Sequence, residues 1–228
     1  MKKQSFFITG TDTGSGKTIA TGLLGRYFKD AGKKVITQKW VQTGDKNISS
    51  DILAHLDLMD ITFEQISKIK DLVMPYIFEF PASPHLAAIK AGCRINVEKI
   101  KRSYFDLMND FDVILVEGSG GVMVPIAEDV LMIDICSELN IPAILVIGNK
   151  LGAINHSLLT IGALREKKID LTGLVFNNIC NETPSEILND NMKIIEKITG
   201  ERIIGIIDNF RGKQTASGSL KIKGNFKF

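Results

Sequence analysis

The chain has 228 residues, enough for one α/β domain with a well-developed core, and we assign residues 1–228 to a single domain. Its formal net charge is only +2, so no excess of charge indicates a nucleic-acid or membrane partner. Aromatic residues make up 7%, too few for the stacking platform that single-stranded nucleic acids use, and a small molecule is the expected ligand.

Short apolar runs recur along the chain, with longer helical stretches between them. The runs are continuous rather than alternating, which predicts strands buried on both faces, at residues 5–9, 113–116, 143–147, 174–176 and 203–207. A further short strand is predicted at residues 34–37. Helices are predicted at residues 17–31, 51–58, 97–109, 131–139, 153–167 and 185–199. This alternation predicts the α/β class, with a mainly parallel central sheet, helices on both faces and the architecture of P-loop nucleotide-binding proteins.

Two segments lack this regularity. Residues 60–91 contain Pro75, Pro81 and Pro84 and are predicted to form an insertion over one end of the sheet. Residues 211–228 are rich in Lys, Gly and Ser and are predicted to form a flexible tail.

Cysteine usage and the apolar runs bear on the protein's location. Cys93, Cys136 and Cys180 lie far apart in the sequence, and no Cys/His cluster indicates a disulfide framework or a zinc site. The apolar run at residues 6–8 is too short for a signal peptide, and no run is long enough to cross a bilayer. We therefore expect a cytoplasmic protein.

The strongest functional signal lies between the first predicted strand and the first predicted helix. Residues 10–18 read Gly-Thr-Asp-Thr-Gly-Ser-Gly-Lys-Thr, a phosphate-binding loop with five residues, not the usual four, between its first glycine and Gly-Lys-Thr. Glycines let backbone N–H groups approach phosphate oxygens, and the helix start adds the positive end of its dipole. Lys17 is expected to bridge the terminal phosphates, and the Thr18 hydroxyl to coordinate magnesium.

Two further groups follow the second strand. Because the carboxyl ends of parallel strands gather at one edge, Lys39 is expected near the γ-phosphate, although a surface lysine is the alternative. Asp51 opens the next helix, either as a first-turn cap or as a magnesium ligand.

Two later strands also end in polar residues. Glu117 closes a buried strand, and a carboxylate at the end of such a strand is typical of a magnesium ligand in nucleotide-binding proteins. The glycines in the following Gly118, Ser119 and Gly120 would let the backbone approach a ligand closely. Asn177 and Asn178 close the fifth strand. A side-chain amide has both a donor and an acceptor and could recognise the edge of a purine base by hydrogen bonds. The alternative is that these asparagines only form a turn.

Taken together, these motifs resemble the dethiobiotin synthetase family. The matching residues occur in the family's order, at positions 10–18, 39–44, 51, 75–76, 83–85, 117–125, 150–156 and 173–178. The five-residue spacing after Gly10 also matches the family.

The resemblance implies a role for each matching position. The nucleotide would be bound by Gly14, Ser15, Gly16, Lys17, Thr18, Ile19, Asp51, Glu117, Gly118, Ser119, Gly120, Asn177 and Asn178, with Asn177 reading adenine. Magnesium would be held by Thr18, Asp51 and Glu117. Lys39 and Lys17 would be catalytic, and Thr43 would position the diamine. The substrate's carboxylate tail would cross a homodimer interface toward a helix start at Gly152 and Asn155.

The implied reaction is an ATP-dependent ring closure. One amine of 7,8-diaminononanoate takes up carbon dioxide to form a carbamate, ATP phosphorylates the carbamate, and the second amine closes the ureido ring of dethiobiotin, releasing ADP and phosphate. Phosphoryl transfer needs positioning and charge neutralisation rather than a protein nucleophile. The histidines His55, His85 and His156 are accordingly interpreted as structural, with His85 expected nearest the substrate pocket.

The chain departs from the family pattern at two places, and two rival functions stay open. Trp40 replaces the proline usual after the active-site lysine, and residues 208–210 stand where the family often has a Pro-containing turn. A partner-binding P-loop ATPase of the partitioning type would carry a lysine early in the loop, where this chain has Asp12. A cobyrinate-amidase type of enzyme would need an additional glutamine-hydrolysing domain.

Overall fold

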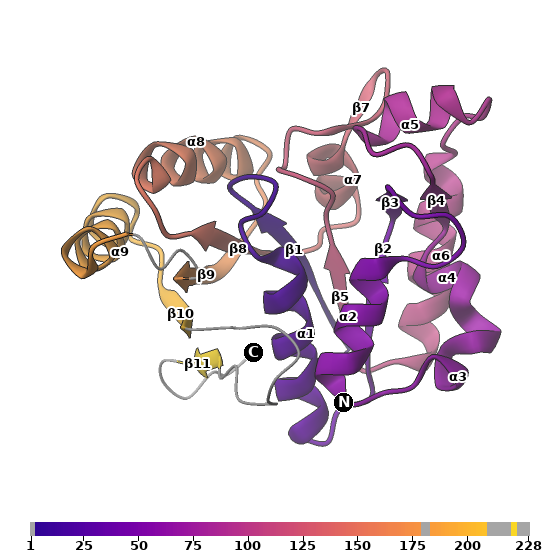
Figure 1. Ribbon diagram of the computed structural model, residues 1–228, viewed down its shortest axis with the longest axis horizontal. Helices are drawn as coiled ribbons and strands as arrows, with labels where there is room; N and C mark the ends of the chain where they lie inside the picture. The colour runs from indigo at the N-terminus through magenta and orange to yellow at the C-terminus, as the bar shows by residue number, and fades with distance from the viewer. Residues whose placement is uncertain (1–2, 179–182, 209–219, 223–228) are drawn as a thin grey trace.

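The computed structural model describes residues 3–178, 183–208 and 220–222. A seven-stranded sheet forms its centre, in the order β11-β10-β9-β8-β1-β5-β2, and β11 pairs antiparallel with β10 whereas the other pairs are parallel (Figure 1). The strands are β1 (Gln4–Gly10), β2 (Val35–Lys39), β5 (Val113–Glu117), β8 (Ala143–Gly148), β9 (Leu171–Asn178), β10 (Ile203–Asp208) and β11 (Leu220–Ile222). The predicted mainly parallel sheet is confirmed.

Helices cover both faces of this sheet, as predicted (Figure 1). On one face lies α1 (Lys17–Asp30), and on the other lie α6 (Val97–Asp110), α7 (Met132–Glu138), α8 (Ala153–Glu166) and α9 (Ser185–Thr199). Helix α2 (Ser50–Met59) packs beside α1 and contributes buried side chains to the clusters on both faces, Met59 to that of α1 and Ile52 and Leu56 to that of α6. Strand alternation assigns the side chains to these faces. In β1, Phe6 and Ile8 join the buried cluster that includes Leu24 of α1, whereas Phe7 joins the cluster that includes Ile100 of α6.

The six predicted helices are all present, and each end lies within one residue of its predicted position. Local capping explains where several of them begin and end. The Ser49 hydroxyl accepts a hydrogen bond from the Ile52 N–H at the start of α2, and the Asn96 side chain caps α6. Gly200 ends α9 in the left-handed conformation, and Pro184 directly precedes the first residue of that helix.

The irregular segment at residues 60–91 consists of short elements, namely α3 (Phe63–Ile66), η1 (Ser67–Ile69), α4 (Lys70–Val73), β4 (Tyr76–Phe78) and α5 (Pro84–Lys90). Strand β4 pairs in parallel with β3 (Val41–Thr43), which directly follows β2 beyond the carboxyl end of the sheet. A second small sheet joins β6 (Pro125–Ala127) to β7 (Val130–Leu131). Strands of two or three residues carry no periodicity of their own, so the sequence did not predict them.

The predicted flexible tail lies mostly outside the described residues. Within it, residues 220–222 form β11 against β10, which the composition did not predict.

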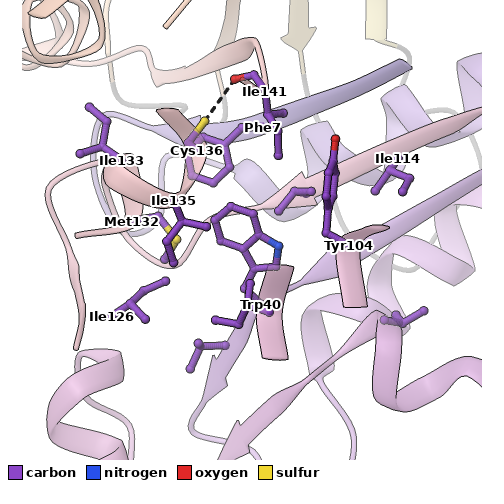
Figure 2. Close-up of a cluster of buried hydrophobic side chains, with 14 of the residues drawn as sticks. Phe7, Trp40, Tyr104, Ile114, Ile126, Met132, Ile133, Ile135, Cys136 and Ile141 are labelled. Atoms are coloured by element: carbon purple, nitrogen blue, oxygen red, sulfur yellow. Dashed lines mark hydrogen bonds between the residues drawn. The ribbon is translucent and has the colours of Figure 1, made fainter. Parts of the chain in front are cut away.

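Trp40 fills the core in place of the expected proline (Figure 2). Its side chain is completely buried and stacks on Phe7, with 5.6 Å between the ring centroids. Its Nε1 donates to Gln38 Oε1 at 3.0 Å, and Gln38 Nε2 donates to the Leu72 carbonyl at 2.8 Å. The residues on either side of Lys39 are therefore held by packing, by a hydrogen bond to each other and by one hydrogen bond from Gln38 to α4.

The helices were expected not to cross a membrane, and the cysteines were expected not to form disulfides or a zinc site. In residues 3–178, 183–208 and 220–222, no helix combines the length and apolarity needed to cross a bilayer. Cys136 is buried, which raises the pKa of its thiol to about 12, and its Sγ donates to the Ile141 carbonyl at 3.2 Å (Figure 2). Cys93 is exposed, and Cys180 lies outside the described residues.

Candidate functional site

A cavity of 410 Å³ lies at the carboxyl edge of β1, β2 and β5, which are neighbours in the sheet. Ligands bind at this edge in open parallel sheets because loops from adjacent strands converge there. The cavity is lined by Thr13, Gly14, Gly16, Lys17, Thr18, Ile19, Lys39, Gln42, Thr43, Asp51, Glu117, Ser119 and Gly120. The structure therefore gathers most of the predicted site residues in one place, from four separate segments of the chain.

The phosphate loop joins β1 to α1 with two glycines in the left-handed region, Gly14 at φ 83° and Gly16 at φ 94°. Gly16 also has no room for a side chain, because a Cβ there would lie 1.9 Å from Asn177 Nδ2. Asn177 Nδ2 donates to the Ser15 carbonyl at 2.9 Å, so this buried amide holds the backbone of the loop against the end of β9. Glycine is required here both for the loop's backbone shape and for the close approach of β9.

Lys17 begins α1 and is almost fully buried. Its Nζ donates to the Asp12 carbonyl at 3.1 Å, within the same loop. Burial lowers the pKa of Lys17, and the neighbouring Lys39 lowers it further, against the opposing effect of Glu117 and Asp51. Two ammonium groups thus face the same cavity, which is the arrangement expected where several negative charges must be neutralised.

Lys39 lies at the base of the cavity, so the alternative of a surface lysine is wrong. Its Nζ is 2.7 Å from Asp51 Oδ2 and 2.8 Å from Glu117 Oε1, and it donates to the Gly118 carbonyl at 3.2 Å. Strand register brings Lys39 and Glu117 together, because they are paired residues at the ends of β2 and β5. Burial alone would lower the pKa of Lys39, but Glu117 and Asp51 outweigh it and raise that pKa.

Three oxygen-bearing side chains converge beside the phosphate loop. The Thr18 hydroxyl lies 3.0 Å from Asp51 Oδ1 and 3.2 Å from Glu117 Oε1. The cap of α2 is Ser49, which leaves the Asp51 carboxylate directed at the cavity rather than at the helix backbone. Oxygen ligands of this kind suit Mg²⁺, which proteins hold with one or two carboxylates together with substrate phosphates. Among the described residues, no group of three or more His, Cys, Asp or Glu side chains could hold a metal by itself.

His55 is the residue that sequence reasoning missed. It is completely buried, and its Nε2 lies 2.6 Å from Glu117 Oε2. Its position four residues after Asp51 places both on one face of α2, and that spacing was the available signal. By contrast, His85 lines a separate cavity of 250 Å³ with Arg94 and Ile126 rather than the cavity at the phosphate loop.

Gln42 is a second residue that the sequence did not single out. It lines the cavity, and its Oε1 accepts from the Ser49 hydroxyl at 2.7 Å, which connects β3 to the start of α2. Nearby, the Ser119 hydroxyl donates to the Val41 carbonyl at 2.6 Å. These bonds fix the loop after β5 against the segment that carries Thr43.

The remaining predicted residues lie outside the cavity lining. Asn178 accepts from Asn149 Nδ2 at 2.8 Å and donates to Asp208 Oδ1 at 2.7 Å, so it joins the ends of β8, β9 and β10. Gly152 precedes α8 at φ 90°, and Asn155 is exposed in the first turn of that helix.

Comparison with known proteins gives a consistent result. Residues 4–213 match the family described as an AAA domain. The chain is 42% identical over 177 residues to the ATP-dependent dethiobiotin synthetase BioD of Chlorobaculum tepidum, covering 78% of this chain and 74% of that protein. It is also 42% identical over 171 residues to the ATP-dependent dethiobiotin synthetase BioD 2 of Haemophilus influenzae, covering 75% and 89%.

A solved structure supports the fold alone. The ParA family ATPase from Chlorobium tepidum superposes with a TM-score of 0.56 at 15% identity, covering 90% of this chain and 84% of that one. The position of the lysine expected in a partitioning-type loop is occupied by Asp12, whose Oδ1 accepts from the Thr13 N–H at 2.7 Å.

Proposed function

The chain belongs to the family of ATP-dependent dethiobiotin synthetases, and we propose that it closes the ureido ring of dethiobiotin from 7,8-diaminononanoate, carbon dioxide and ATP. Such an enzyme is a ligase that forms carbon–nitrogen bonds. The observation that carries the proposal is the convergence of Lys17, Lys39, Asp51 and Glu117 on one cavity beside the phosphate loop.

The charges in the cavity suit each step of this reaction. The first amine takes up carbon dioxide, and the resulting carbamate anion is attracted by the Lys39 ammonium. The loop from Gly14 to Thr18 and the Lys17 ammonium hold the phosphates of ATP, so the carbamate oxygen can attack the γ-phosphorus in line. The second amine then attacks the carbamoyl phosphate carbon and expels phosphate. Thr43 and Gln42 also line the cavity and would orient the diamine.

We propose that Thr18, Asp51 and Glu117 hold Mg²⁺ together with the phosphates of ATP. The distances of 3.0 and 3.2 Å among their oxygens support this donor set. The ion would screen phosphate charge during transfer. Lys39 contacts the same two carboxylates, so it couples their orientation to the place where the carbamate binds.

We propose that the base of the nucleotide lies beside Asn177 and Asn178. The Nδ2 of Asn177 is engaged by Ser15, whereas its buried Oδ1 has no hydrogen-bond partner among the described residues. An acceptor of this kind matches the exocyclic amino group of adenine. Asn178, which is bonded on both sides, would support this edge of the site rather than contact the base.

A homodimer is proposed from the exposed face of α8. Asn155 and Leu159 are four residues apart on that face, and Leu159 is 66% exposed although it is a large apolar side chain. A second copy covering this face would bring the helix start at Gly152 and Asn155 toward the partner's substrate, where free N–H groups favour its carboxylate tail.

Leu159→Glu should therefore convert a dimer to a monomer. The matched control is Ile198→Glu, because Ile198 is an apolar residue 57% exposed on α9. Sedimentation equilibrium of both variants and the wild-type protein measures the mass directly. An unchanged dimer in Leu159→Glu, or dissociation in both variants, would contradict this interface.

The decisive test of the function is a product assay. We expect protein, Mg-ATP, bicarbonate and 7,8-diaminononanoate to yield the cyclic urea, detected by mass spectrometry, with one ADP released per ring closed. We propose that this activity belongs to a single domain acting in the cytoplasm, where ATP is supplied. ADP release without the cyclic urea would contradict the synthetase function while leaving the nucleotide site intact.

A further inference from the structure

The two oxygens of the Glu117 carboxylate have separate partners. Oε2 lies 2.6 Å from His55 Nε2, while Oε1 lies 2.8 Å from Lys39 Nζ and 3.2 Å from the Thr18 hydroxyl. His55 therefore bonds the oxygen that faces the interior, and the other oxygen faces the cavity. One oxygen of Glu117 is therefore used to hold the side chain in place, and the other is available to the site.

The tautomer of His55 follows from its surroundings. Its Nδ1 is buried and has no hydrogen-bond partner among the described residues. A hydrogen on Nδ1 would be a buried unsatisfied donor and would leave two acceptors, the bare Nε2 and the carboxylate, in contact at 2.6 Å. His55 accordingly carries its hydrogen on Nε2 and donates it to Glu117.

A donor on Oε2 matters because a glutamate side chain does not fix its own carboxylate plane. The terminal torsion of glutamate is broad, so the plane is set by whatever the oxygens contact. Both His55 and Asp51 extend from α2, and α2 therefore positions one ligand directly and the other through a hydrogen bond. Second-sphere donors of this kind orient carboxylates that bind metals.

We propose that His55 is a positioning residue for magnesium, one that holds the Glu117 carboxylate in the orientation that presents Oε1 to the ion. This inference rests on the proposed function, since it concerns the Mg-ATP site of that reaction. His55 does not line the cavity, but in this proposal it strengthens metal binding in addition to its contribution to packing.

The test compares His55→Leu, which has no donor, with His55→Gln, whose amide nitrogen can replace Nε2. The measured quantity is the ratio of the ATP dissociation constant in EDTA to that in saturating Mg²⁺, obtained by calorimetry without diamine. We expect His55→Leu to reduce this ratio by about tenfold and His55→Gln to restore it to within about threefold of the wild-type value. Binding of ATP in EDTA should be the same in all three proteins.

The possible results distinguish the positioning role of His55 from the magnesium site itself. Equal ratios in wild type and His55→Leu, or equal losses in both variants, would overturn the positioning role alone. A wild-type protein that binds ATP identically with and without Mg²⁺ would overturn the proposed magnesium site and this inference with it. If His55→Leu does not fold, the ring of His55 in the ¹⁵N-histidine-labelled wild-type protein decides. A hydrogen on Nε2 whose signal shifts with Mg-ATP supports the proposal, and a hydrogen on Nδ1 overturns it.

Discussion

Lys39→Met should reduce dethiobiotin formation by about 10³-fold while leaving ATP binding measurable, the size expected when a preorganised charge is removed from a buried site. The reason is the division of labour between two ammonium groups. Lys17 lies within the phosphate loop, whereas Lys39 lies between the two carboxylates at the base of the cavity. Methionine keeps an unbranched side chain that is one atom shorter and removes the charge.

The measurements are the rate of cyclic urea formation at saturating diamine and the dissociation constant of ATP. Lys46→Met is the matched control, because Lys46 is an exposed surface lysine paired with Glu79. It should leave both quantities unchanged. Near-normal turnover of Lys39→Met would show that Lys39 is not catalytic. Loss of ATP binding would show that Lys39 contributes to binding the substrate ATP rather than to stabilising the transition state.

The same substitution should change the response of stability to pH. Burial alone would raise the pKa of Glu117, but Lys39 and His55 together outweigh it and hold that pKa below its ordinary value of 4.5, while the pKa of Lys39 is raised above 10.5. A depressed carboxyl pKa contributes stability above pH 4.5 that is lost as the pH falls, and a raised lysine pKa contributes stability below pH 10.5 that is lost as it rises. The wild-type pair is thus fully stabilising between these limits.

Much of the site could be predicted because its signals are local. The phosphate loop is one continuous segment between a strand and a helix, and the ends of β2 and β5 follow directly from their apolar runs. Parallel topology then places Lys39 and Glu117 at one edge without further information. The fold class was predictable for the same reason, since the strands of the central parallel sheet other than β2 centre on buried apolar runs.

What sequence reasoning missed depends on contacts between distant segments. The spacing from Asp51 places His55 on the same face of α2 as a predicted site residue, but it does not identify the partner of His55 as Glu117, 62 residues away. Trp40 was a departure from the family pattern until the structure showed its stacking on Phe7. The strands β3 and β4 exist only as partners of each other, and short strands are determined by such pairing rather than by propensity.

Glu117→Gln should have the second large effect, because Glu117 lies between two donors. Lys39 donates to Oε1 and His55 donates to Oε2, so the NH₂ group of glutamine must face a donor whichever way the amide turns. Breaking a buried ion pair by removing one partner costs about 3–5 kcal/mol, and Asp51 still accompanies Lys39, so we expect about 3 kcal/mol. That loss corresponds to a decrease in Tm of about 6–12 °C for a chain of this size.

The functional consequence of Glu117→Gln should be a loss of magnesium response in addition to a slower reaction. A carboxylate that only stabilised the fold would lower Tm without changing the Mg²⁺ concentration needed for half-maximal rate, whereas a ligand of the ion must raise that concentration. Glu138→Gln is the matched control, since Glu138 forms a surface ion pair with Lys101 and should change neither quantity. An unchanged magnesium titration in Glu117→Gln would limit Glu117 to a structural role, and the two carboxylates would then differ in kind, with Asp51 left as the acidic ligand.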